Sequence, residues 1–140
     1  MSVKQISVFL ENKAGEIAKV SAVMANKGVN IRALSIADTP DFGILRIITE
    51  YTDDTVSILK EAGYTCLVTR VIAVKIDDEP GSLAKVMALV SEAGINIEYA
   101  YAFIGKNHGA YMIIRVKDNE EAKKILADNG IEIARACEMF

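Results

Sequence analysis

Residues 12–20 read NKAGEIAKV, and residues 78–86 read DEPGSLAKV. In each copy an apolar segment precedes a turn marked by Gly15 or Gly81, and an amphipathic segment follows, which predicts a strand, a turn and a helix. The sequences GVNI at 28–31 and GINI at 94–97 then follow at the same spacing. Such a turn presents bare backbone N–H groups at the positive end of a helix dipole, which suits an anionic group such as a carboxylate. The sequence therefore predicts a small-ligand pocket that is built twice.

The segments around the first copy predict one ferredoxin-like unit. Ile6, Val8 and Leu10 alternate with other residues, as in a strand with one apolar face. Ile17, with three later residues at helical spacing, gives the stripe of a helix that Gly28 ends. The predicted elements are a strand at 3–10, a helix at 16–27, strands at 29–37 and 44–50, a helix at 52–62 with Val56, Leu59 and Ala62 buried, and a strand at 64–70. This order, β-α-β-β-α-β, is that of the ferredoxin-like unit.

When the sequence of this unit is shifted by 66 positions, it aligns with the rest of the chain. The match holds across a strand, a helix and a hairpin, and it slips by one residue only near the second helix. There Asp118 and Glu121 form a start that resembles a capping box. We therefore expect two domains, residues 1–69 and 70–140, in an α+β fold with antiparallel sheets and helices on one face of each. No linker composition separates them, so we expect the modules to pack side by side.

Composition restricts the class of protein. The 140 residues carry a formal net charge of −3 and no run of lysine and arginine, which argues against nucleic-acid binding. No apolar run approaches the ~20 residues of a membrane span, and no signal peptide is recognisable, so we expect a cytoplasmic protein without membrane association. Cys66 and Cys137 lie in strand-like runs without a C-x-x-C pair, which favours buried thiols over a redox or metal role.

These residues resemble a known family. Two β-α-β-β-α-β units, each with the N/D-x-x-G-x-[IL]-A-x-V helix start and the G-[VI]-N-I entry into the second strand, look like tandem ACT domains over nearly the whole chain. The resemblance implies a regulatory module without catalysis or cofactor, which binds a free amino acid or a similar small ligand between two such domains. It also implies a homodimer and a partner that is an enzyme or regulator of amino-acid metabolism. No enzyme accompanies the two modules here, as in the stand-alone members.

The resemblance further implies where a ligand would bind. The backbone at 13–17 and 79–83 would receive a carboxylate, and Asn30 and Asn96, with the backbone of Ile31 and Ile97, would hold amino or carbonyl groups from the partner module. The first copy lacks the acid and the proline of the family's D-x-P-G, so the two sites are expected to differ in affinity. The full set of expected ligand-binding residues is Asn12, Lys13, Ala14, Gly15, Glu16, Ile17, Asn30, Ile31, Asp78, Glu79, Pro80, Gly81, Ser82, Leu83, Asn96 and Ile97.

A purely structural interpretation competes with this one. The glycines would then only make turns and the asparagines only satisfy backbone groups at strand starts, and Lys13 would be a solvated lysine rather than a countercharge. Tyr99, Tyr101 and Phe103 share one face of a predicted strand. This pattern suggests a second hypothesis, a structural or partner-binding module that acts through its sheet face and dimerisation without a small ligand.

Catalysis has little support in the sequence. His108 is the only histidine, in a glycine-flanked turn, and we find no Ser-His-acid set, metal-ligand cluster or phosphate-binding glycine loop. The ferredoxin-like fold also hosts small hydrolases of the acylphosphatase type, so the fold alone does not decide the function. Such a hydrolase would need a phosphate-binding arginine in the first loop, where Lys13 and Glu79 stand instead.

Overall fold

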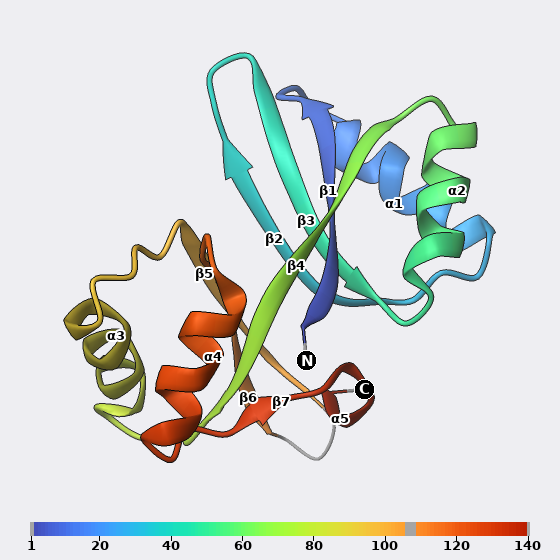
Figure 1. Cartoon of the computed structure of the whole chain (residues 1–140). Coiled ribbons are helices and arrows are strands. Elements are labelled where there is room, and N and C mark those ends of the chain that lie inside the picture. Colours follow the sequence, from blue (N-terminus) through green and yellow to red (C-terminus); the bar gives the residue numbers. More distant parts are fainter. Residues whose placement is uncertain (1, 106–108, 140) are drawn as a thin grey trace. The chain divides into compact units, whose positions relative to one another are not determined.

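The computed structural model describes residues 2–105 and 109–139. The chain forms two compact units, of which Lys4–Thr69 is the first and the remaining described residues are the second (Figure 1). Strand β4, Thr65–Ile76, passes without interruption from the first unit into the second. One strand thus serves as the last strand of the first unit and the first strand of the second. How the two units pack together stays a prediction.

The first unit has the predicted β-α-β-β-α-β order. Its elements are β1 (Val3–Glu11), α1 (Glu16–Asn26), β2 (Ile31–Asp38), β3 (Phe42–Thr49), α2 (Thr52–Glu61) and the start of β4. The strands lie in the order β2-β3-β1-β4, and β1 pairs antiparallel with β3, with Ile6 opposite Ile47. The ferredoxin-like fold of this unit is therefore confirmed.

Both helices of the first unit pack on one face of its sheet. Val20 and Met24 of α1 and Leu59 of α2 are buried in one cluster with apolar residues of β1 and β3. Some predicted members of the helical stripes are exposed: Ile17, in the first turn of α1, is 45% exposed, Ser21 is exposed one turn later, and Ala62 is exposed just beyond the end of α2. The buried part of each helix is therefore shorter than the sequence pattern predicts.

The alternation in β1 is also only partly a guide to burial. Gln5 and Ser7 lie on the strand face opposite Ile6 and Val8, yet they are buried as well. The Gln5 Nε2 atom donates a hydrogen bond to Ser7 Oγ at 3.4 Å. The predicted strand with one apolar face is therefore confirmed, and its opposite face is buried at Gln5 and Ser7 as well.

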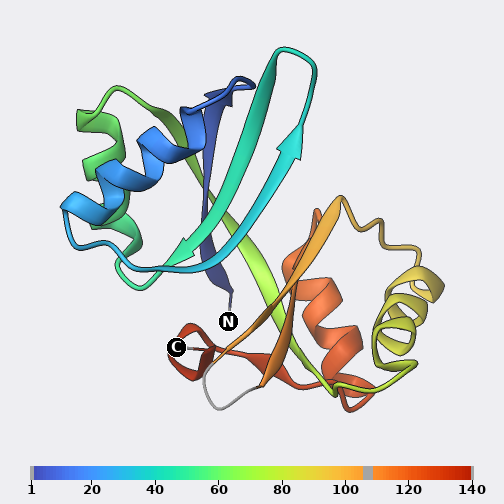
Figure 2. The same ribbon diagram turned by 180° about the vertical axis from the view of Figure 1, so that it is seen from behind.

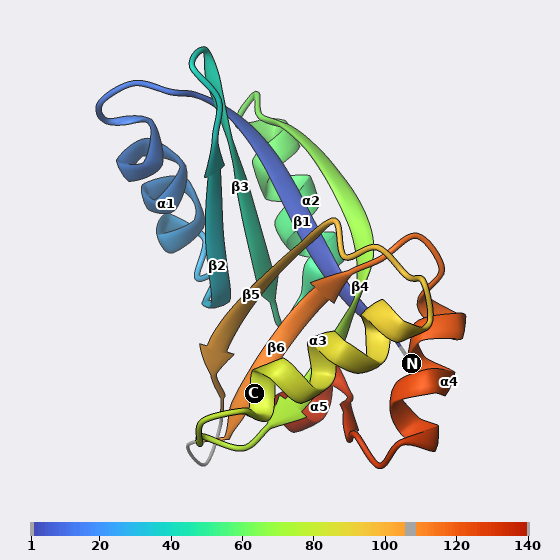
Figure 3. The same cartoon turned by 90° about the vertical axis from the view of Figure 1, so that its left-hand side faces the viewer.

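The second unit repeats the same order with a short last strand. After β4 come α3 (Ser82–Glu92), β5 (Tyr99–Ile104), β6 (Ala110–Arg115), α4 (Asn119–Asp128), β7 (Ile133–Ala134) and α5 (Ala136–Met139). The strand order is β5-β6-β4-β7, the counterpart of the first unit. Figure 2 and Figure 3 show α3 and α4 on the same side of these strands, where residues such as Val86, Val90 and Leu126 form the core with Ile72 and Ile114.

Two local predictions in this unit are confirmed. The Asp118 carboxylate accepts a hydrogen bond from the Glu121 amide at 3.1 Å and so caps α4. Tyr99, Tyr101 and Phe103 are half-buried while the residues between them are exposed, so the three rings do share a face of β5. The Phe103 ring stacks on Tyr111 with a centroid distance of 5.5 Å.

The two cysteines differ. Cys66 is buried in β4, as predicted. Cys137 is exposed and lies in α5, so its assignment to a strand and to a buried environment is wrong. The chain turns there because the Glu138 carboxylate accepts a hydrogen bond from the Arg135 amide at 2.9 Å, and the Glu138 amide donates to the Arg135 carbonyl at 3.0 Å.

Candidate ligand-binding site

The two glycine turns have the same backbone geometry. Gly15 has φ 89° and Gly81 has φ 92°, both in the left-handed region, and each lies directly before a helix. A residue with a Cβ pays for this conformation and glycine does not, which explains its place in both copies. Neither α1 nor α3 has a side chain that caps its N-terminus.

The first turns of α1 and α3 therefore keep free donors. Among the described residues, the amides of Ile17 and Ala18 in α1, and those of Leu83 and Ala84 in α3, have no hydrogen-bond acceptor. The first N–H groups of a helix have no partner within the helix, and at the positive end of the dipole they favour an anion. Both predicted loops thus have the chemistry for a carboxylate.

The first loop is tied to its own unit. The side-chain Nδ2 of Asn12 donates a hydrogen bond to the Thr39 carbonyl at 2.9 Å. Lys13 Nζ lies 2.9 Å from Glu11 Oε2. The Glu11 carboxylate raises the pKa of Lys13, and the Lys13 ammonium lowers the pKa of Glu11. Asn12 and Lys13, both expected to bind a ligand, therefore already have partners.

The second loop borders a pocket. Glu79, Pro80, Gly81 and Ser82 line a pocket of 480 Å³, together with residues of β4 and of the segment after α4. Two of the lining residues form an ion pair, with Lys75 Nζ 3.8 Å from Glu132 Oε2. The pocket thus exposes the uncapped start of α3 to solvent.

The predicted asparagines lie at the other ends of the same helices. Asn30 follows α1 and directly precedes β2, and Asn96 lies in the segment between α3 and β5. Each helix has 11 residues, which corresponds to about 16 Å at 1.5 Å per residue. The structure therefore does not bring the loop and the asparagine of one unit together.

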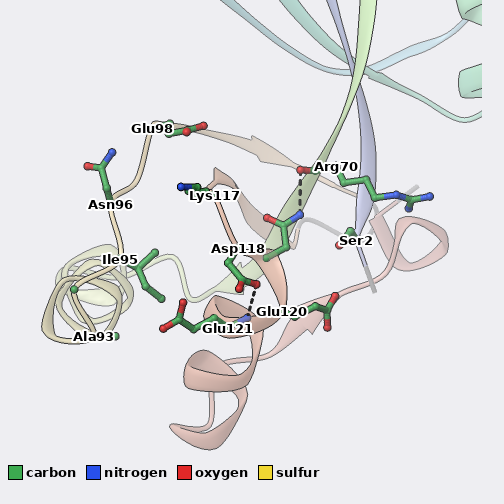
Figure 4. Close-up of a pocket in the computed structure, with 12 residues that line it drawn as sticks. Ser2, Arg70, Ala93, Ile95, Asn96, Glu98, Lys117, Asp118, Glu120 and Glu121 are labelled. Carbon is green, nitrogen blue, oxygen red and sulfur yellow. Dashed lines mark hydrogen bonds between the residues drawn. The ribbon is translucent and has the colours of Figure 1, made fainter.

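Each asparagine lines a pocket of its own, and the two pockets differ in size. Asn96 lines one of 830 Å³, and Asn30 lines one of 160 Å³. Figure 4 shows the Lys117 side chain directed toward the segment that carries Asn96 and Glu98. Among the described residues Lys117 has no ion pair, whereas Glu98 lies 3.2 Å from Arg115.

The β6–α4 turn in this pocket was not predicted as part of the site. The repeat itself holds a signal for it, because the shift of 66 that aligns Asn30 with Asn96 also aligns Tyr51 with Lys117. Tyr51 and Lys117 each line the pocket of their own unit. The repeat slips by one residue directly after this position, so the N-cap residue that matches Tyr51 in the second unit is Asp118.

The remaining residues expected to bind a ligand adjoin the two glycine loops or the two asparagines. Ala14, Glu16 and Ile17 continue the first loop into α1, and Asp78 and Leu83 flank the second. Ile31 and Ile97 are partly buried, and their side chains pack against the cores of their units.

Other kinds of site find little support in the part of the chain that the structure describes. Residues 2–105 and 109–139 hold no group of three or more His, Cys, Asp or Glu that could bind a metal ion. His108 lies outside the described residues. In those same residues no helix combines the length and the apolar character that crossing a membrane requires.

Comparison with known proteins agrees with this architecture. A crystal structure of a protein from Bacteroides thetaiotaomicron has 35% sequence identity and a TM-score of 0.91, over 99% of this chain and 96% of that chain. The regulatory subunits of aspartate kinase from Thermus thermophilus and Thermus flavus each superpose with a TM-score of 0.65. Their identities are 18% and 17%, over 91% and 89% of this chain and 92% and 88% of theirs, a likeness that shows the fold alone.

No curated protein matches the chain. A family model described as an ACT domain pair matches residues 1–139. That match spans nearly the whole chain and both β-α-β-β-α-β units. The chain therefore belongs to the family of ACT domain pairs.

Proposed function

We propose that this protein is a regulatory module that binds a free amino acid between two ACT modules and has no catalytic activity of its own. One observation carries the proposal: α1 and α3 both begin at a left-handed glycine, and their first amides have no acceptor among the described residues. A ligand carboxylate would accept hydrogen bonds from these amides.

The separation of loop and asparagine supports a site that is shared between modules. The α-carboxylate and the α-amino group of an amino acid lie a few ångströms apart, whereas Gly81 and Asn96 are separated by the length of α3. We therefore assign the carboxylate to the loop of one module and the amino group to the asparagine of another. Asn30 and Asn96 suit the second task because an amide side chain both donates and accepts.

The family supports the regulatory class. The fold is shared with regulatory subunits of aspartate kinase, which makes an enzyme or regulator of amino-acid metabolism the kind of partner that we propose. A homodimer would supply further module pairs. A cytoplasmic location stays a prediction.

Thermal unfolding in the presence of each of the twenty amino acids tests the proposal. An amino acid at 100 times its Kd stabilises the folded state by about 2.7 kcal/mol, which is a readily measured shift. The double variant Asn30→Ala, Asn96→Ala should lose the shift and keep the fold. Asn26→Ala, at an exposed position of α1, is the matched control and should keep the shift. If no amino acid shifts the wild-type transition at millimolar concentration, amino-acid binding is refuted.

The aromatic face of β5 supports a second candidate, a partner-binding module without a small ligand. Tyr99, Tyr101 and Phe103 present three rings on one face of a strand at the edge of the second unit's sheet. Tyr101→Glu should then change the oligomeric state in size-exclusion chromatography. An unchanged elution volume would contradict this candidate and leave amino-acid binding untouched.

A further inference from the structure

We propose that two copies of this chain associate through the outer edge of β2, with the two β2 strands side by side, antiparallel and centred on Ser35. This inference goes beyond amino-acid binding, because it names a surface between two copies that forms without any small ligand. It also chooses between the two edge strands of the repeat, β2 and β5.

Strand β2 has an open edge. It is the outer strand of the first unit's sheet, and among the described residues it pairs with β3 alone (Figure 1). An edge strand presents a row of backbone N–H and C=O groups that can pair with another strand, and proteins block such edges with charged residues or proline. Residues 33–37 read ALSIA and contain neither. The middle of this edge is therefore available to a further strand.

The exposed apolar side chains of β2 lie on the helix side of the sheet. In the pairing with β3, Leu34 lies opposite Ile47. Ile36 lies opposite Leu45 in the same way. Both β3 residues are buried in the core, and directly paired residues share a face of a sheet, so Leu34 and Ile36 extend the apolar face. Leu34 is nevertheless 52% exposed and Ile36 46%, and a strand added at this edge would cover them.

The sequence of β2 is complementary to itself in one antiparallel register. When Ser35 lies opposite Ser35 of the second copy, Leu34 lies opposite Ile36 of that copy. On the other face of the strand, Ala33 lies opposite Ala37 of the second copy. Large apolar residues thus meet each other on one face and small residues meet on the other. Such cross-strand pairs are what stabilises a sheet.

The charged residues near the ends of β2 favour the same register. Arg32 and Asp38 have opposite charges, and the alignment about Ser35 brings each of them toward the other residue of the second copy. A register that is shifted by two residues places Leu34 opposite Asp38, or Ile36 opposite Arg32. Either shift sets an apolar side chain against a charge, so the centred register is the one in which two copies fit.

The corresponding edge of the second unit suits this association less well. Strand β5 is the outer strand there, and its exposed row on the helix side consists of Ala100, Ala102 and Ile104. Because the apolar area of an alanine side chain is small, covering two alanines contributes less than covering Leu34 and Ile36.

Sedimentation velocity of the full chain at micromolar concentration, without any amino acid, tests the surface. We expect a dimer for the wild type and a monomer for Ile36→Lys, which sets a charge opposite Leu34 of the second copy. Leu67→Lys makes a similar exchange at an exposed position of β4, and Ile104→Lys makes it on β5; both should remain dimers. A thermal unfolding curve for each variant checks that it is folded.

Disulfide cross-linking tests the register. The background is Cys137→Ser, which removes the exposed native thiol. There Ser35→Cys should form a linked dimer under mild oxidation, because opposite residues of antiparallel strands have Cα atoms about 4.5–5.5 Å apart, within the range of a disulfide. Chains with Leu34→Cys and chains with Ile36→Cys should link to each other after mixing, and neither should link to itself.

Three results would overturn the inference. The first is a monomeric wild type, and the second is a folded Ile36→Lys variant that stays dimeric. The third is a dimer in which Ser35→Cys does not cross-link, or which Ile104→Lys dissociates, since the interface would then lie elsewhere. None of these measurements contains an amino acid, so a failure of amino-acid binding in the thermal shift leaves this inference standing.

Discussion

Gly81 and Asn96 lie at opposite ends of α3, Gly81 directly before its first residue and Asn96 four residues after its last. The 11-residue helix between them is about 16 Å long, a length that no α-amino acid bridges with its carboxylate and amino groups. Gly15 and Asn30 have the same relation across α1. The two halves of the repeated motif therefore lie at opposite ends of one helix in each unit, and the role that we propose for each half can be tested separately.

Replacing Gly81 by alanine should abolish amino-acid binding through this half of the site. The left-handed backbone costs an L-residue roughly 1–2 kcal/mol, so the loop should relax and misplace the α3 amides. An added Cβ would meet nothing within 4 Å, so the effect comes from the backbone alone. The measurement is the thermal shift that the best amino acid gives to wild type and variant.

Gly63→Ala is the matched control for this variant. Gly63 has φ 91° against 92° for Gly81, also has open space around its Cβ position, and follows α2 in the first unit, outside the pocket that the Gly81 loop lines. We expect a similar loss in the free energy of unfolding with the amino-acid shift retained. Equal loss of binding in both variants would mean that stability, not the loop, controls binding.

The sequence predicted the repeat, the element order and the places of both glycine turns, because these depend on local signals. Periodicity and glycine reflect the preferences of a few neighbouring residues, so the Asp118 cap was predictable from its spacing to Glu121. The burial of Gln5 depends on what covers the strand, which alternation does not contain. The pocket around Asn96 is likewise completed by Lys117, which is distant in sequence and comes close only in the folded unit.

Thr49 and Thr55 form a buried hydroxyl pair that should show an unequal response to substitution. Their Oγ1 atoms lie 3.0 Å apart, and Thr55 Oγ1 donates to the Tyr51 carbonyl at 2.8 Å. Because a hydroxyl has one hydrogen, Thr49 must be the donor to Thr55. Thr55→Val strands that buried donor and should cost about 1–3 kcal/mol, more than Thr49→Val, which leaves Thr55 bonded to Tyr51.

Urea unfolding of both single variants and the double variant checks this assignment. The double variant should be more stable than Thr55→Val alone, since it removes the stranded hydroxyl. Equal losses in the two single variants would show that the donor direction is wrong.

The ion pair of Glu120 and Lys123 should make stability depend on pH in the acid range. Glu120 Oε1 lies 2.7 Å from Lys123 Nζ, and this hydrogen bond lowers the pKa of Glu120 and raises that of Lys123. A carboxylate with a depressed folded-state pKa stabilises the protein above its unfolded value of 4.5, and the stabilisation is lost as pH falls through the folded-state pKa. Glu120→Gln should thus be less stable than wild type at neutral pH only.

Urea unfolding at neutral pH and at about pH 3 measures this difference. Glu121→Gln is the control, because its carboxylate has no ion pair among the described residues and its amide keeps the bond to Asp118. A difference between wild type and Glu120→Gln that is the same at both pH values would contradict the expected linkage.

A change of the N-cap residue should alter the stability of the protein in opposite directions at the β3–α2 turn and at the β6–α4 turn. Asp118 caps α4 with φ −115° and ψ 97°, while Tyr51 holds the same position before α2 with φ −113° and ψ 83° and forms no cap. A cap of this kind contributes roughly 0.5–2 kcal/mol, so Asp118→Ala should lose about that amount. Tyr51→Asp should gain a similar amount, because the Tyr51 side chain is 67% exposed and loses little burial. Thermal and urea unfolding measure both, and a destabilised Tyr51→Asp variant would show that this turn cannot place a carboxylate on the Asp54 amide.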